Sequence, residues 1–205
     1  MQTELEGIFY ILILIISVVI HEVSHGFVAE YFGDDTARNE GRLTLNPIPH
    51  IDLFGSIILP AFLVFTNSSF LIGWAKPVPF NPENFNDKKT ATIAVASAGV
   101  LANFFIAIFF GLILRFSTDF NLPTEFNFII SSIVILNLSL AIFNLVPIPP
   151  LDGSKILFQL LPKSFSNLEK LMEDYALIFI LIFIIYFSQY LSPIIFYLNK
   201  IIIGF

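Results

Sequence analysis

The chain has 205 residues, of which 56% are hydrophobic and 13% are charged, and its mean hydropathy is +0.84. Soluble domains carry roughly twice that share of charged residues, so the composition predicts an all-α polytopic membrane protein, built as one domain over residues 1–205. The absence of cysteine excludes disulfides and thiolate zinc sites, and a net charge of −6 without a basic stripe argues against nucleic acid as a partner.

The first half of the chain alternates apolar runs with polar stretches. Residues 7–32 form an apolar run with helix-forming composition, and its length exceeds the roughly 20 residues that cross a bilayer. Residues 42–46 (RLTLN) alternate in polarity, which predicts a short membrane-associated β-strand. Residues 51–65 are apolar but contain Gly55 and Pro60, so we expect a re-entrant segment or a short span there.

The second half contains longer apolar runs. Residues 91–114, 126–146 and 175–191 each predict a membrane span, and a shorter apolar segment covers residues 194–205. We therefore expect about four to six transmembrane helices in all. Small residues recur every four positions in the first of these runs, which indicates close helix packing, and Asn103 in the same stripe is placed to hydrogen-bond a neighbouring helix.

The segment His21-Glu22-Val23-Ser24-His25 carries the main chemical signal. Histidines four residues apart lie on one face of a helix, where both rings can bind one Zn²⁺. Glu22 lies about 100° further round the helix and can act as general base on a water at the metal. Because ionisable residues in a spanning helix are costly and functional by default, we interpret His21, Glu22 and His25 as a site.

A catalytic zinc ion needs a third protein ligand and an open position. His50, Asp52 and Asp152 are the candidates, together with acids in the loops. Asp152 stands out because it follows a proline run that ends an apolar span, and prolines stop the helix so that the chain can turn inward. The alternative for Asp152 is an N-cap of the helix predicted to follow it. His50 and Asp52 are more typical of a polar hairpin near the membrane surface.

Two motifs together resemble a known family. The HEVSH segment and residues 144–153 (NLVPIPPLDG) resemble the paired signature of the site-2 protease family, peptidase family M50, and the second segment matches the pattern N-x-x-P-x-P-x-L-D-G throughout. Residues 73–82 (GWAKPVPFNP) and 97–103 (SAGVLAN) resemble further family segments, except that Val100 replaces the usual proline. The resemblance implies a minimal member, without PDZ or CBS domain, that cleaves transmembrane segments of membrane-protein substrates in regulated intramembrane proteolysis.

The same resemblance implies the roles of particular residues. It implies one zinc ion bound by His21, His25 and Asp152, with Glu22 as the base that activates the zinc-bound water. It also implies that Asn144 lies near the active site, where it orients substrate or stabilises the oxyanion.

The zinc hypothesis sets a condition on topology, because the end of the first span and Asp152 must lie at one depth. A full crossing by residues 51–65 would put them on opposite sides, whereas a re-entrant segment brings the two ends together. Eight of the 10 basic residues then fall in the segments 33–90 and 152–174, as the positive-inside rule requires of cytoplasmic segments. We therefore expect an outside N-terminus and an active site near the cytoplasmic face of the cell membrane.

Substrate contacts are predicted in two segments. An unwound substrate could pair with Leu43, Thr44 and Leu45 by β-augmentation, and the proline run with Pro147 and Pro149 could flank the same groove. The alternative is that both segments are only connecting loops.

Two other functions are compatible with these residues, namely a zinc transporter and a non-catalytic zinc-binding homologue. Glu22 has no evident use in a carrier and the chain shows no inverted repeat, which argues against transport. The intact motifs argue against a silent homologue. The sequence leaves the oligomeric state and the substrate open.

Overall fold

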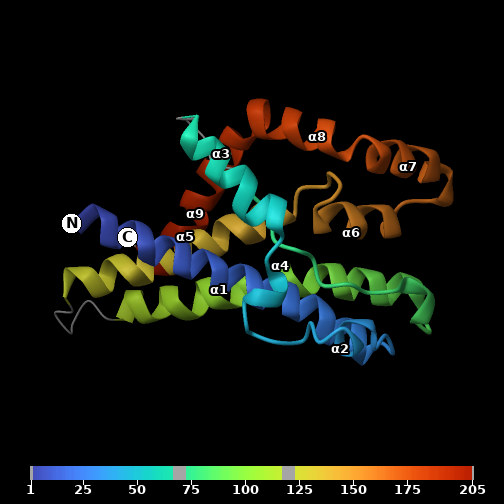
Figure 1. The fold of residues 1–205 in the computed structure, drawn as a ribbon, viewed down its shortest axis with the longest axis horizontal. Helices are drawn as coiled ribbons and strands as arrows, with labels where there is room; N and C mark the ends of the chain where they lie inside the picture. The colour runs from blue at the N-terminus through green and yellow to red at the C-terminus, as the bar shows by residue number, and fades with distance from the viewer. Residues whose placement is uncertain (1, 67–72, 117–122, 205) are drawn as a thin grey trace.

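The computed structural model describes residues 2–66, 73–116 and 123–204, and the regular secondary structure of these residues is helical throughout (Figure 1). Four helical runs are long and apolar enough to cross a membrane, namely α1 (Gln2–Tyr31), α4 (Lys88–Phe116), α5 (Thr124–Asn144) and the run Ala176–Ile203. The expectation of an all-helical polytopic membrane protein is therefore confirmed, at the lower end of the expected number of spans.

Helices α1, α4 and α5 form the centre of the fold. Helix α4 packs against both of the others, and it runs antiparallel to them, so α1 ends at the same end of the bundle as α4 begins and α5 ends (Figure 1). The buried positions of α4 are mostly small, including Ala91, Gly99, Ala107 and Gly111. Small residues let helix backbones approach closely, which favours van der Waals packing between helices inside a bilayer.

The last span is bent. It consists of α8 (Ala176–Ile182), a π-turn (Phe183–Phe187), a 3₁₀ turn (Ser188–Tyr190) and α9 (Leu191–Ile203). The two irregular turns redirect the chain, so that α8 lies along the top of the view and α9 turns back towards α5 (Figure 1). The apolar segments 175–191 and 194–205 are separate in the sequence prediction, but within the described residues they share one helical run, Ala176–Ile203. Side chains of α9 pack against the α4–α5 core, and α8 contributes no buried residue.

The segment between α1 and α4 contains only short helices, namely α2 (Thr36–Asn39), η1 (Ile48–His50), η2 (Leu53–Ile58), α3 (Leu59–Phe65) and η3 (Pro82–Asn84). The strand prediction for residues 42–46 is wrong, because none of these residues lies in a strand and Thr44 and Leu45 form a bend. The carbonyl of Thr44 accepts a hydrogen bond from His50 Nε2 at 2.9 Å, and Thr44 Oγ1 accepts one from the Asn46 N–H at 3.2 Å. These local bonds stabilise a turn in place of a sheet ladder.

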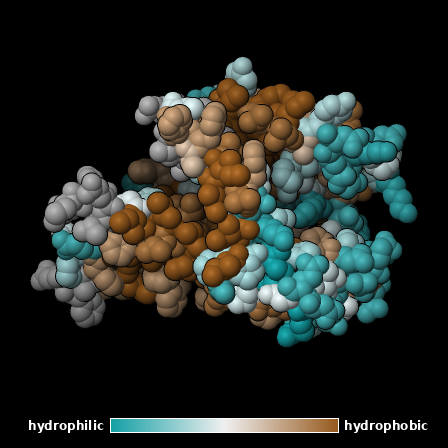
Figure 2. Space-filling model, in the orientation of Figure 1, coloured by the Kyte–Doolittle hydropathy of each residue, from teal (hydrophilic) through white to brown (hydrophobic). Residues whose placement is uncertain are grey.

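Polar side chains gather at one end of the molecule. After α5 the chain forms α6 (Asp152–Leu160), η5 (Lys163–Phe165) and α7 (Ser166–Asp174). Figure 2 shows apolar surface over the middle of the molecule and hydrophilic surface at the end where α2 and α7 lie. The C-terminal part of α1, which carries both histidines, therefore approaches the polar end of the bundle.

Candidate metal centre

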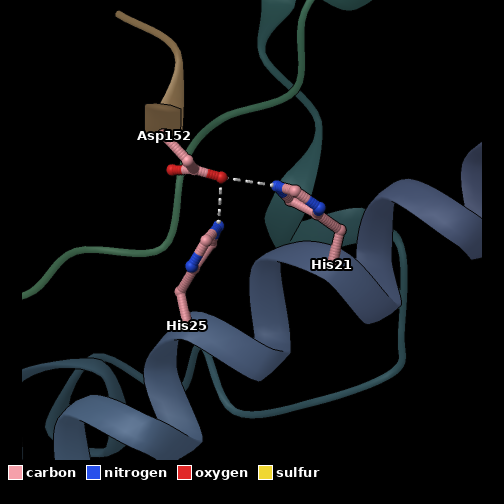
Figure 3. Close-up of side chains that lie close together, drawn as sticks. All are labelled: His21, His25 and Asp152. Carbon is pink, nitrogen blue, oxygen red and sulfur yellow. Dashed lines mark hydrogen bonds and ion pairs between the residues drawn. The ribbon is translucent and has the colours of Figure 1, made fainter. Parts of the chain in front are cut away.

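Helix α1 and the first residue of α6 bring three buried side chains together. Nε2 of His21 lies 3.1 Å from Oδ2 of Asp152, and Nε2 of His25 lies 3.2 Å from the same oxygen (Figure 3). The three ligand atoms all lie within 4.8 Å of one another. Two residues from one helix and one from a distant helix thus point at a single small volume.

The other two candidates for a third ligand lie elsewhere. His50 uses Nε2 to hold the Thr44 carbonyl, and Asp52 caps η2 by accepting from the Gly55 N–H at 2.6 Å. Asp152 is the first residue of α6, and Leu151 takes the N-cap position without a side-chain cap. The N-cap alternative for Asp152 is therefore wrong, and its carboxylate faces the histidines.

Hydrogen bonds at Nδ1 of both histidines determine which ring nitrogens can bind a metal. His21 Nδ1 donates to Asn103 Oδ1 and His25 Nδ1 donates to the Val95 carbonyl, both at 2.6 Å. In neutral imidazoles protonated at Nδ1, the Nε2 lone pairs must face Asp152. Three electron-rich atoms then converge, an arrangement that a cation between them stabilises. Two imidazoles and one carboxylate are a set of three protein ligands typical of a catalytic zinc site, so the residues present fit the ion.

Helix α4 provides a close-fitting seat for the histidines. Val95, Gly99 and Asn103 are spaced four residues apart on α4, which matches the spacing of His21 and His25 on α1. A Cβ at Gly99 would come within 2.6 Å of Cε1 and Nε2 of His21. The sequence prediction interprets the small residues of this helix, Gly99 among them, as helix packing, and the polar Asn103 in an apolar helix is the signal for a more specific role.

The backbone before α6 aims Asp152 at the site. The proline-containing loop 145–151 turns the chain after α5. A Cβ at Gly153 would lie 2.2 Å from the carbonyl oxygen of Leu145, so the start of α6 packs directly on the loop backbone. On the solvent side, Lys155 Nζ lies 3.6 Å from Asp152 Oδ1 and 5.3 Å from the centroid of the Phe80 ring.

The carboxylate of Glu22 is held by a loop that the sequence prediction does not connect with the site. Glu22 Oε2 accepts a hydrogen bond from the Val78 N–H at 2.8 Å. The buried Arg42 fixes the same loop, because Nη2 donates to the carbonyls of Lys76 and Pro77 at 2.8 Å and 3.1 Å. The sequence places Arg42 only in a predicted strand, and its burial cannot be read from the local pattern.

Asn144 lies at the end of α5 and is partly buried. Its Nδ2 donates to the Leu140 carbonyl of its own helix at 3.0 Å. Among the described residues, no hydrogen bond joins Asn144 to His21, His25 or Asp152. The structure therefore does not bring Asn144 into the metal centre itself.

The predicted substrate-binding residues are spread over different environments. Leu43 and Thr44 are partly buried and Leu45 is exposed. In the proline run, Pro147 is exposed but Pro149 is buried, so Pro149 is closed to a substrate in this structure. Leu45 also lines an apolar groove with Pro47 and with Ile15, Ile16, Val19 and Ile20 of α1.

An HExxH helix joined to a distant aspartate, within a bundle of membrane-length helices, defines the class of membrane zinc metalloproteases. Residues 124–187 match the model of peptidase family M50. Two relatives are named putative zinc metalloproteases: YwhC of Bacillus subtilis, 37% identical over 189 residues (89% of this chain, 83% of YwhC), and Rip2 of Mycolicibacterium smegmatis, 30% identical over 151 residues (72% and 56%). No solved structure matches the chain. The chain belongs to peptidase family M50, the site-2 protease family, and is a zinc metalloprotease.

Proposed function

We propose that the protein is an intramembrane zinc metalloendopeptidase that cleaves transmembrane segments of membrane-protein substrates. The observation that carries this proposal is the convergence of His21 and His25, both in a membrane-length helix, on the carboxylate of Asp152. A hydrolytic site inside such a bundle acts on peptide bonds that lie in or near the bilayer.

His21, His25 and Asp152 would hold one Zn²⁺, which when bound polarises the scissile carbonyl and lowers the pKa of a water molecule. Glu22 takes the proton from the attacking water and passes it to the leaving amine. The Val78 N–H holds Oε2 of Glu22, while Oε1 has no hydrogen bond to the described residues and is free to accept the proton. Asn144 keeps one amide N–H beyond its bond to Leu140, and we assign this donor to the substrate carbonyl.

A helical substrate must unwind before its peptide bond can be attacked. We propose that Leu43, Thr44, Leu45 and Pro147 line the path of the unwound segment. Support comes from Leu43, whose Cδ2 would lie 2.5 Å from a Cβ at Gly26, so that it packs on α1 one residue beyond His25. Strand pairing is not part of this proposal, because the Thr44 carbonyl already binds His50.

The proposed site lies near the cytoplasmic face of the cell membrane. Residues 53–65 leave the polar end and the chain returns to the same place, because the Trp74 N–H donates to the Gly55 carbonyl at 3.2 Å and Ser56 Oγ donates to the Trp74 carbonyl at 2.8 Å. This out-and-back path supports a re-entrant segment. The helix ends that meet at the site then share the side rich in basic residues.

The decisive experiment compares wild type with Glu22→Gln, reconstituted with a reporter membrane protein that carries one transmembrane helix. The introduced amide oxygen can still accept from the Val78 N–H, so zinc content should be unchanged, while cleavage should fall by about 10²–10⁴-fold because general-base catalysis is lost. Glu30→Gln is the matched control, since Glu30 lies on the same helix and, within the described part of the chain, forms an ion pair only with Arg38. Unchanged turnover in Glu22→Gln would refute the protease mechanism, and zinc flux into vesicles that persists in this variant would favour the transporter.

A further inference from the structure

A chain of buried amide groups leads away from the back of His21. Asn103 on α4 and Asn137 on α5 are 0% exposed and Ser17 on α1 is 3% exposed, although all three lie in membrane-length helices. Asn103 Nδ2 donates to Asn137 Oδ1 at 2.7 Å, and Asn137 Nδ2 donates to Ser17 Oγ at 2.9 Å. These hydrogen bonds therefore join the three central helices at the level of the metal centre.

Chemistry determines which end of each amide group donates and which accepts in this series of hydrogen bonds. Asn137 Nδ2 also donates to the backbone carbonyl of Ile133 at 2.9 Å, and a carbonyl oxygen can only accept. The amide nitrogen of Asn137 must point there, so its oxygen must face Asn103. Asn103 then presents its nitrogen to Asn137 and its oxygen to His21 Nδ1. An acceptor at that position requires a proton on Nδ1.

A proton on Nδ1 leaves Nε2, the ring nitrogen that faces Asp152, without a proton in the neutral imidazole. We propose that Asn103 and Asn137 are positioning residues that hold His21 in the Nδ1-protonated form and in the correct ring orientation, so that Nε2 is always available to the metal. This inference rests on the proposed zinc site. His25 has a simpler arrangement, because the backbone carbonyl of Val95 performs the same task without a side chain.

Two observations separate this role from ordinary helix packing. The first is that Asn103 uses both ends of its amide, one for Asn137 and one for His21, whereas packing alone would need only a bond between helices. The second is the steric fit at Gly99, one turn before Asn103, where the ring of His21 lies so close to α4 that a Cβ would stand 2.6 Å from it. The acceptor oxygen of Asn103 is thus the group that the metal site needs.

The test measures metal binding by the full-length protein in detergent, using zinc competition with a chelator and the visible absorption of the Co²⁺-substituted protein. Asn103→Leu should lower zinc affinity by about 10–100-fold, the usual effect of removing such a partner, and should change the Co²⁺ bands. Asn103→Asp keeps the acceptor oxygen towards His21 but loses the N–H donor to Asn137, so its loss of affinity should be smaller than that of Asn103→Leu. Asn137→Leu should give an intermediate loss, because Asn103 then loses the bond that orients it.

Ser132→Ala is the matched control, since Ser132 is also buried on α5, and among the described residues its hydroxyl bonds only to the Phe128 carbonyl of its own helix. Thermal unfolding of each metal-free variant shows whether that variant is folded. If Asn103→Leu does not fold, Asn103→Asp provides a second variant for the test. Wild-type affinity in a folded Asn103→Leu, or an equal loss in Asn103→Asp, would overturn the inference. Failure of the wild type to bind zinc would instead refute the proposed function.

Discussion

Gly99 of α4 lies directly against the imidazole of His21, so that a Cβ at this position would stand 2.6 Å from two ring atoms. The ring is therefore confined between α4 on one side and the carboxylate of Asp152 on the other. Such a fit fixes the ligand before any metal binds, and it depends on the absence of a single methyl group.

Gly99→Ala should push His21 out of its position and weaken zinc binding, with a cost of about 1–3 kcal/mol from overpacking. Isothermal titration of the metal-free protein with zinc would measure the effect. Gly7→Ala is the control, because a Cβ at Gly7 meets nothing within 4 Å. Equal zinc affinities in the two variants would show that the contact between α4 and His21 tolerates a methyl group.

Arg42→Met should impair turnover while leaving zinc content unchanged. Without the guanidinium, the carbonyls of Lys76 and Pro77 lose their donor and the Val78 N–H no longer holds Glu22 in place. Misplacement of a catalytic group by about 1 Å costs on the order of 10²-fold in rate. The comparison of cleavage rate with bound zinc measures this effect.

The control for that experiment is Arg38→Met, because the Arg38 side chain is 59% exposed and pairs with Glu30 at the surface. Exposed ion pairs contribute little, so this variant should behave like wild type. A parallel loss in both arginine variants would point to a general effect of charge.

Asp34 should make stability depend on pH. Burial alone would raise the pKa of Asp34, but hydrogen bonds from Thr36, Asn81 and Asn84 outweigh burial and hold the pKa below its ordinary value of 3.8. The folded-state pKa is thus lower than the unfolded one, so the stabilisation is present above about pH 4 and is lost as the pH falls through the folded-state pKa. Asp34→Asn should unfold more easily at pH 7, by about 1–3 kcal/mol, and show a flatter profile below about pH 5.

Thermal unfolding in detergent between about pH 7 and pH 3 measures that profile. The neighbouring Asp35→Asn serves as the control, since Asp35 is exposed. If the Asp34 and Asp35 variants followed the same pH profile, the buried carboxylate would not be the source of the dependence.

The proposed topology can be tested with single cysteines, because the natural chain has none. Glu83→Cys lies in the loop before α4, and Glu125→Cys lies at the start of α5, at the opposite end of the bundle. A membrane-impermeant maleimide should label residue 125 from outside intact cells and residue 83 only in inverted vesicles. Labelling of residue 83 from outside would contradict the cytoplasmic placement.

The grouping of His21, His25 and Asp152 was largely readable from the sequence, because part of its geometry follows from local spacing. The i, i+4 spacing of His21 and His25 fixes their shared face on any helix, and the cost of a carboxylate beside an apolar span singles out Asp152. The contact of Val95, Gly99 and Asn103 with the histidines could not be predicted from the sequence, since no local rule states which face of α4 packs against α1. Asn103 stood out as polar, but its partner atom follows only from tertiary packing.

The failures in the fold have a similar cause. Residues 42–46 alternate as a strand does, yet a strand needs a partner, and here the side chains of Thr44 and His50 close a turn on the same backbone. The sequence prediction ends one apolar segment at residue 191 and begins the next at residue 194, although Pro193 between them occupies the third position of α9, where a proline is tolerated. Local pattern therefore identifies helices better than it predicts their partners or bends.

The distance in sequence between the ligands has a consequence for the stability of the whole molecule. His21 and Asp152 are 131 residues apart, and the chain has no disulfide. A metal ion bound by both would act as a cross-link, and closing a loop of that length removes conformational entropy worth about 4–5 kcal/mol from the unfolded chain in the simplest model. The centre proposed to carry out hydrolysis would then also tie the first helix to the last third of the fold, so that losing the ion would loosen the protein that holds it.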